Sequence, residues 1–226
     1  MTIDTKDLLN SILSSFDRMT YIKSDDIPGI DLYMDQVTTF MDERLKKSTR
    51  NQSEEKLMTK TMINNYAKNN VIPPPDKKKY NKEHILILIM VYYFKSILQI
   101  SDIKELMDPI IEKFFDNRNG FAIEDVYDEI FSEMDADLVR VRDEVVAQYN
   151  DAMTKFDDAP DADQDYLKLY SFVCKLGCDV FVKKLLIEKI VDSLREQTGS
   201  AGSKSGKSKD KDNKYDVSVE KKSKKQ

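Results

Sequence analysis

Residues 71–94 read VIPPPDKKKYNKEHILILIMVYYF, and this stretch decides most of the fold. Three consecutive prolines lie near its start. Three lysines and a tyrosine follow them, and an apolar run from His84 completes the stretch. Proline fixes φ and has no N–H, so the prolines end any helix before them. The β-branched residues of the apolar run would permit a buried strand, but its continuation to Leu98 makes it long for one. We therefore predict a buried helix over 84–98.

The composition favours a mostly helical protein. Of the 226 residues, 40% are hydrophobic, enough for one sizeable core, or one core and a small appended domain. Six glycines and six prolines supply few of the turns that a many-stranded sheet needs. The sequence has no apolar run of about 18 uncharged residues, and its start does not resemble a secretion signal. We expect an all-α, soluble, cytoplasmic protein with no membrane partner.

Apolar residues at helical spacing predict the remaining helices and the domain limits. Helices are expected at 6–19, 31–47, 60–69, 102–115, 121–134, 136–156 and 164–196. Ser101 and Asp102 are predicted to cap the start of the helix at 102–115. Asn70 suits the left-handed conformation that closes the helix at 60–69. The expected domains are an N-terminal helix (1–26), a helix-turn-helix domain (27–115), an acidic helical region for dimerisation or an effector (116–197) and a disordered Lys/Ser-rich tail (198–226).

One expected helix has an unusual distribution of apolar residues. From Tyr166 to Ile187 the helix at 164–196 is apolar on nearly every side. A helix of this kind is either central to a bundle or shared with a partner chain. The sequence leaves both alternatives open.

Charge is segregated along the chain, although the net charge is only −5. Residues 45–104 carry 12 basic and 5 acidic side chains, for a net charge of +7. Residues 105–170 carry 6 basic and 19 acidic side chains, for a net charge of −13. A basic block beside a strongly acidic one indicates a basic binding surface, an acidic region that covers it, or both.

The residue types that catalysis and metal binding require are not suitably placed. The cysteines, Cys174 and Cys178, lie four apart in an apolar run, so we predict reduced thiols packed in the core. His84, the only histidine, is predicted to start or pack the apolar helix. The glycine-containing run 201–208 lacks the flanking strand and helix of a phosphate-binding loop, and the acidic stretches fail the register of a calcium loop. We expect no enzyme activity, cofactor or metal.

The basic segment is the candidate binding site, because its charges occur in an ordered context. The helix at 60–69 combines an inward apolar face with polar side chains that can meet phosphates or base edges. The three lysines follow it directly, and a solvated helix followed by a linker is the alternative interpretation. The candidate DNA-binding residues are Lys60, Thr61, Asn64, Asn65, Lys68, Lys77, Lys78, Lys79, Tyr80 and Lys82, with Tyr80 expected to pin the returning chain to the core.

This order of elements resembles the MerR-like winged helix-turn-helix. The matching segments are 62–73 (MINNYAKNNVIP), 79–84 (KYNKEH) and 98–106 (LQISDIKEL), which resemble the recognition helix, the end of the wing and a later helix. Asn64 and Asn65 stand where that family has Arg and Tyr, and Asn70 stands where it has Gly. The resemblance implies that the helix at 60–69 enters the major groove of DNA and that a basic wing (76–82) holds the backbone.

Residues 27–107 more closely resemble an uncharacterised bacterial family, domain of unknown function 1836. The combination of consecutive prolines, Lys-Lys-Lys-Tyr and a long apolar helix carries this resemblance. In the MerR type a long helix pairs two chains. The resemblance therefore implies a homodimer that is formed through the helix at 164–196 or the helix at 102–115. A small-molecule or protein effector is also compatible with such a regulator.

Two functions of different classes follow from these features. The first is a DNA-binding transcriptional regulator whose partner is double-stranded DNA. The second is a protein-interaction or adaptor module with a degenerate helix-turn-helix, because the acidic block could meet a basic partner or cover the basic segment.

Overall fold

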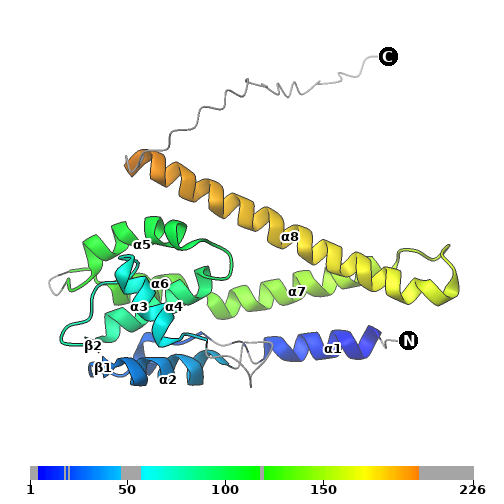
Figure 1. Cartoon of the computed structure of the whole chain (residues 1–226). Helices are drawn as coiled ribbons and strands as arrows, with labels where there is room; N and C mark the ends of the chain where they lie inside the picture. Colours follow the sequence, from blue (N-terminus) through cyan, green and yellow to red (C-terminus); the bar gives the residue numbers. More distant parts are fainter. Residues whose placement is uncertain (1–4, 18, 20, 47–56, 118–119, 199–226) are drawn as a thin grey trace, which may run out of the picture.

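The computed structural model describes residues 5–17, 19, 21–46, 57–117 and 120–198, and this part of the chain is mostly helical (Figure 1). The all-α expectation is confirmed, with one short two-stranded sheet added. In chain order the elements are α1 (Thr5–Phe16), the 3-10 helix η1 (Ser24–Asp26), β1 (Leu32–Tyr33), α2 (Met34–Leu45), α3 (Lys60–Lys68), β2 (Lys79–Tyr80), α4 (Lys82–Phe94), α5 (Ile100–Phe114), α6 (Ile123–Phe131), α7 (Met134–Met153) and α8 (Asp161–Thr198).

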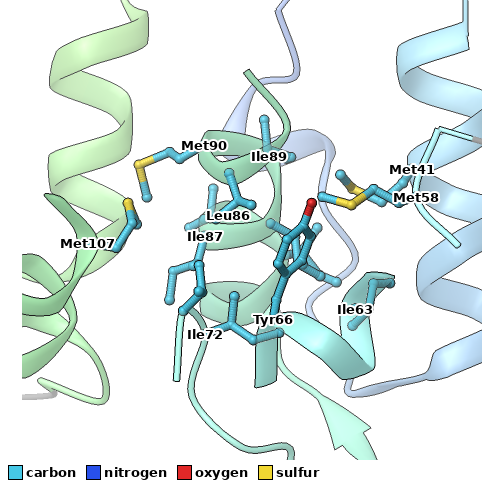
Figure 2. Close-up of a cluster of buried hydrophobic side chains, with 14 of the residues drawn as sticks. Met41, Met58, Ile63, Tyr66, Ile72, Leu86, Ile87, Ile89, Met90 and Met107 are labelled. Carbon is cyan, nitrogen blue, oxygen red and sulfur yellow. The ribbon is translucent and has the colours of Figure 1, made fainter. Parts of the chain in front are cut away.

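The apolar run forms α4, which is the centre of the larger hydrophobic core. Eight consecutive residues, from His84 to Val91, are buried on every side of this helix. Figure 2 shows α4 between side chains from neighbouring elements: Met41 of α2, Ile63 and Tyr66 of α3, and Met107 of α5. A helix that is apolar all round is stable only when it is enclosed in this way.

The sheet is small but joins two distant segments. β1 pairs with β2 in antiparallel register, with Leu32 opposite Tyr80 and Tyr33 opposite Lys79. The prediction of a helix from residue 31 is therefore wrong at its start, because Leu32 and Tyr33 pair with β2 before α2 begins at Met34. This pairing fixes the basic segment against the start of α2.

A second, smaller core lies where α1, α7 and α8 meet. Its buried side chains are Val145, Tyr149, Ala152 and Phe172, with residues of α1 packed around them. The Tyr149 hydroxyl donates a 2.8 Å hydrogen bond to the Thr5 carbonyl oxygen. In Figure 1, α7 extends away from the group of α2 to α6, and α8 returns from this second core towards α5.

The end of α8 is attached to α5 by charge as well as by apolar contact. Val191 is buried in the larger core, and the Arg195 guanidinium donates a 2.8 Å hydrogen bond to the Asp102 carboxylate. The prediction that Ser101 and Asp102 cap α5 is wrong, because α5 begins at Ile100 after Gln99, and Gln99 makes no side-chain cap. Asp102 lies within the helix and binds α8 instead.

The cysteine prediction is wrong about burial. Cys174 and Cys178 are free thiols, but both are exposed on α8. The reason is tertiary: this part of α8 packs against α7 on one face, through Phe172 and Leu176, and the cysteines lie on other faces. The prediction that His84 opens and packs the apolar helix is confirmed, because it is the third residue of α4 and 4% exposed.

The prediction of a left-handed residue after the third helix is also confirmed, because Asn70 has φ of 54°. The disordered tail, the run 201–208 and the interval 47–56 lie outside the described residues.

Candidate nucleic-acid interface

The candidate reading helix, α3, is bounded by strong local signals at both ends. At its start, the Thr59 hydroxyl accepts a 3.1 Å hydrogen bond from the Met62 N–H. At its end, the Val71 N–H bonds to the Tyr66 carbonyl and the Asn70 N–H to the Ala67 carbonyl, at 2.9 and 3.1 Å. This pair of bonds is the Schellman arrangement, which needs a left-handed residue and finds it in Asn70.

The two faces of α3 differ in chemistry. Ile63 and Tyr66 point into the larger core and are buried (Figure 2). Burial raises the pKa of the Tyr66 hydroxyl, which therefore stays neutral. The opposite face contains the predicted residues Lys60, Thr61, Asn64, Asn65 and Lys68, all exposed. A shallow hollow runs along this face and is lined by Thr59, Thr61, Met62, Asn64, Asn65 and Lys68.

These exposed side chains are not equally free to bind a ligand. The Asn65 side-chain oxygen accepts a 2.9 Å hydrogen bond from the Asn69 amide, so Asn65 is held against the helix end. Lys60 forms an ion pair with Asp35 at the start of α2. Asn64 and Lys68 have neither a hydrogen bond nor an ion pair through their side chains within the described residues. They are the two most available polar groups on this face.

The lysine segment forms a tight turn rather than a linker. The Lys79 N–H donates a 2.8 Å hydrogen bond to the Asp76 carbonyl, and the two turn residues between them have positive φ, 47° for Lys77 and 68° for Lys78. Positive φ at both central positions defines a type I′ turn, which Asn-Gly normally occupies. Lys77 and Lys78 are exposed at the tip and form no ion pair with any described residue.

Tyr80 lies behind this turn and is 2% exposed. Its ring meets the His84 ring edge-on, at 5.5 Å between centroids, and His84 meets Phe115 in the same way at 4.9 Å. Burial raises the pKa of the Tyr80 hydroxyl. The position of Tyr80 suits support of the turn rather than direct contact with a ligand.

His84 connects the start of α4 to the proline segment. Its Nδ1 lies 2.5 Å from the Asn81 side-chain oxygen and its Nε2 3.4 Å from the Pro74 carbonyl oxygen. Burial lowers the pKa of His84, while the Pro74 carbonyl and the Asp31 charge oppose that shift. The neutral ring is therefore the form that the packed structure favours.

Lys82 is the one predicted lysine that the acidic region covers. Its ammonium lies 2.6 Å from the Glu124 carboxylate of α6, and its side chain is only 24% exposed. Lys82 thus ties α4 to α6 and is less available to a ligand than Lys77 or Lys78. It also shows that the acidic half reaches the edge of the basic segment without covering its tip.

Tyr33 is a surface residue that sequence reasoning missed. It is 54% exposed on β1, and the Lys79 ammonium lies 5.4 Å from the centre of its ring. Two residues further along the chain, Asp35 pairs with Lys60 of α3. Tyr33 and Asp35 therefore link the lysine turn to the start of α3 in one continuous surface. The signal in the sequence was a lone tyrosine beside an expected helix start, which carries little information without the strand pairing.

Other kinds of site find little support in the described part of the chain. Among those residues, no group of three or more His, Cys, Asp or Glu side chains is arranged to hold a metal ion. Within the same ranges, every helix is too short or too polar to cross a membrane.

Comparison with known proteins gives a match between part of this chain and a family model. Residues 22–130 match the family model described as "Domain of unknown function (DUF1836)". The match supports the resemblance to this uncharacterised family and extends beyond the expected 27–107 to include α6. No curated protein and no solved structure matches the chain.

Proposed function

We propose that this protein is a DNA-binding transcriptional regulator of the MerR-like winged helix-turn-helix type. The observation that carries the proposal is the surface formed by the polar face of α3 and the Lys77–Lys78 turn. The side chains of this surface are exposed. Its two parts are joined by the contact of Lys79 with the Tyr33 ring and by the ion pair of Lys60 with Asp35. We call it the α3–wing surface.

The shape of α3 fits the major groove. A helix with its side chains is about 10–12 Å across, and the major groove of B-DNA is about 12 Å wide. In this pose Asn64 would face the base edges, because its amide is exposed and has no partner within the described residues. Asparagine can bond the N6 and N7 atoms of adenine with both of its polar atoms. Lys68, one turn further, would meet a phosphate.

The lysine turn supplies the sequence-independent part of binding. Lysines that contact phosphates release counterions from DNA and so contribute affinity that falls with salt. Lys77 and Lys78 occupy backbone conformations that non-glycine residues rarely adopt. Strained backbone of this kind is more common at functional sites, where the side chain is retained for its chemistry. We infer that charge, and not backbone preference, accounts for these two lysines.

A second function, an adaptor module without DNA binding, is favoured by a different observation. Lys60 and Lys82 are already neutralised, by Asp35 and Glu124 respectively. Lysines that already form ion pairs within the chain contribute less to phosphate binding. The two proposals differ in a measurable quantity, the salt dependence of binding to duplex DNA.

The test is a salt series of binding to a pool of random duplex DNA. The variant Lys77→Ala/Lys78→Ala/Lys79→Ala should flatten the slope of log affinity against log salt by about 2.7, since each phosphate contact contributes about 0.9. The matched control is Lys23→Ala/Lys104→Ala/Lys155→Ala, which removes the same charge from the residue before η1, from α5 and from the segment after α7. The control should keep the wild-type slope.

The opposite results are equally clear. If wild-type protein binds no duplex at any salt concentration, the regulator proposal is wrong and the adaptor function takes its place. If both triple variants change the slope equally, binding depends on net charge and not on the α3–wing surface. An additional Asn64→Ala variant should lower affinity for a selected site while leaving affinity for the random pool unchanged.

A further inference from the structure

The outward face of α3 presents a small set of side chains that can distinguish one base pair from another. The inward residues Ile63 and Tyr66 fix which side of the helix faces outward (Figure 2). Five exposed residues at helical spacing form that outward side: Lys60, Thr61, Asn64, Asn65 and Lys68. In a helix that lies in the major groove, the residues of the first turns meet the base edges. The availability of each side chain therefore determines which DNA sequences the proposed regulator would prefer.

Asn64 and Asn65 are neighbours of the same type, but only Asn64 has both of its polar groups available. The Asn65 side-chain oxygen accepts a 2.9 Å hydrogen bond from the Asn69 amide, which also bonds to the Asn65 carbonyl oxygen at 2.7 Å. Asn64 makes no side-chain hydrogen bond with any described residue. Paired bonding to adenine uses the side-chain oxygen for N6–H and the amide for N7. Asn64 can form this pair directly, whereas Asn65 would first have to release Asn69.

The hollow beside Asn64 supplies an apolar contact on the same face. Thr61 and Met62 contribute to its lining, and their side chains carry a methyl group and a thioether. In the major groove, thymine is distinguished by its C5 methyl group, and the methyl group of a threonine is one of the groups that contact it. The hollow is therefore suited to a thymine.

Thr61 and Asn64 have the right spacing to read neighbouring base pairs. They are three residues apart and lie on one face of the helix, where such positions have Cβ atoms about 5–6 Å apart. Successive bases along one strand of DNA are about 3.4 Å apart. The two side chains therefore span one to two base-pair steps.

The cations of α3 are poorly placed to read guanine. Guanine is recognised most often by Arg or Lys, through its O6 and N7 atoms. The sequence of α3 contains no arginine, and Lys60 at its start forms an ion pair with Asp35. Lys68 lies eight residues after Lys60, about 12 Å further along the axis, in the last turn. That position suits a phosphate better than a base edge.

We propose that α3 reads A·T pairs. Asn64 bonds an adenine, and Thr61 contacts the methyl group of a thymine in a pair one or two steps away. This inference rests on the proposed function, since it names the class of duplex that the α3–wing surface would select. It gives Lys68, Lys77 and Lys78 phosphate contacts only. Affinity for duplex DNA and preference for A·T pairs are then separate properties that depend on different side chains.

The first test uses the full chain to select bound sequences from a pool of random duplexes. The selected duplexes should share at least two A·T pairs that are adjacent or separated by one pair. Selected duplexes that share G·C pairs in their place would overturn the inference. Binding to the pool without selection of any common sequence would also overturn it.

The second test measures the adenine contact on a selected duplex, with an adenine analogue in which carbon replaces N7. Wild-type protein should bind the analogue about 5-fold more weakly, or worse, because the paired bonding is lost. Asn64→Ala should bind the natural duplex at least as weakly and should not respond to the analogue. The matched control is Asn65→Ala, which removes the same side chain one position further and should keep the wild-type response. A full response in Asn64→Ala would contradict the assignment of this residue.

The third test replaces the selected thymine with uracil, which lacks only the C5 methyl group. Wild-type protein should lose about 4-fold in affinity, the value expected for one buried methyl group. Thr61→Ser keeps the hydroxyl and removes the methyl group, so it should bind the thymine duplex more weakly and lose little more with uracil. Thr39→Ser, the control, changes an exposed threonine of α2 and should respond as wild type does. Equal responses in both serine variants would remove Thr61 from the thymine contact.

Failure of this inference can be told apart from failure of the proposed function. A protein that binds random duplex with the expected salt dependence, but selects no A·T pairs, keeps its DNA binding and loses only the reading assigned to Asn64 and Thr61. A protein that binds no duplex at any salt concentration overturns both proposals. Circular dichroism should be the same for all four variants, because the substituted side chains are exposed.

Discussion

α4 and α8 each contain an apolar stretch of helix, and the tertiary structure treats them in opposite ways. In α4, Ile85 to Val91 are buried on every side by α2, α3, α5 and α6. In α8, Val180 to Leu186 are exposed on every side between two places of contact. Two apolar stretches of helix thus have different outcomes, and the exposed one also contains Lys183 and Lys184. An apolar helix becomes a core only when enough other elements converge on it.

The apolar side chains of α4 and α8 also differ in what they contribute to the stability of the fold. Side chains on α4 stabilise the fold of one chain. The exposed apolar side chains in the middle of α8 contribute little to that fold.

The largest expected effect comes from Leu86→Ala in α4, compared with Leu186→Ala in α8. Leu86 is 0% exposed, so its truncation leaves a cavity and should lower the free energy of unfolding by about 2–5 kcal/mol. Leu186 is 56% exposed, and its truncation should change the stability of the monomer by less than about 0.5 kcal/mol. Urea denaturation at low protein concentration measures both. Equal losses would mean that α8 is enclosed within one chain after all.

The next effect depends on pH and on the only histidine. Burial lowers the pKa of His84 in the folded protein below that in the unfolded chain, against opposition from Pro74 and Asp31. As pH falls below about 6.5, the unfolded chain takes up the proton more readily. Stability should therefore fall from that pH downwards and level off below the folded-state pKa.

Urea midpoints at about pH 7.5 and about pH 5.5 test this linkage. The wild-type midpoint should decrease at the lower pH, and the decrease should be smaller in His84→Gln, which places a neutral amide at that position. Hydrogen exchange in 177–186 of α8, corrected for its intrinsic pH dependence, should not share the change. An identical decrease in the variant would assign the pH dependence to carboxylates instead.

A smaller effect is expected where α8 is attached to α5. Arg195→Met removes the hydrogen bond to Asp102 and the nearby contacts with Glu105 and Asp192. Because the guanidinium is partly exposed and screened, the loss should be about 1 kcal/mol, with faster hydrogen exchange in 187–197. Arg140→Met is the matched control, since its ion pairs lie within α7, and it should leave that exchange unchanged. Unchanged exchange in Arg195→Met would show that apolar packing of Val191 and Ile187 is enough to hold the end of α8.

The smallest effect has opposite signs in the two regions. At the lysine turn, Lys77→Asn/Lys78→Gly introduces residues that adopt positive φ easily and should raise stability by about 0.5–1 kcal/mol. In α8, Lys183→Asn/Lys184→Gly places glycine inside a helix and should lower stability by about 1 kcal/mol or slightly more. The turn variant should also flatten the salt slope of DNA binding by about 1.8. Loss of stability at the turn would contradict the assigned backbone conformation.

Much of the helical structure was predictable because its signals are local. The extent of α3 and its closure by Asn70 follow from a Thr cap, apolar spacing and a residue that tolerates positive φ. The burial of α4 follows from a long apolar run with few charges. The β1–β2 pairing was not predictable, because it joins segments more than 40 residues apart through only two residues on each strand. Short strands carry too little periodicity to be recognised.

The candidate site was predicted in part for the same reason. The polar face of α3 and the lysine turn are contiguous in sequence, so their residues could be named directly. The role of Tyr33, the neutralisation of Lys60 by Asp35 and the cover of Lys82 by Glu124 depend on contacts between distant elements. Sequence spacing contains no information about such contacts in a chain that is rich in charges.

The sequence by itself determined which segments are helical, where α3 begins and ends, and which lysines lie together, since backbone preferences and hydrophobic spacing act over a few residues. Only the tertiary structure decided that the middle of α8 is open, that the cysteines are exposed and which lysines have acidic partners. The physical reason is that burial and ion pairing depend on where distant elements converge. In this protein they converge on α4 and leave the middle of α8 open.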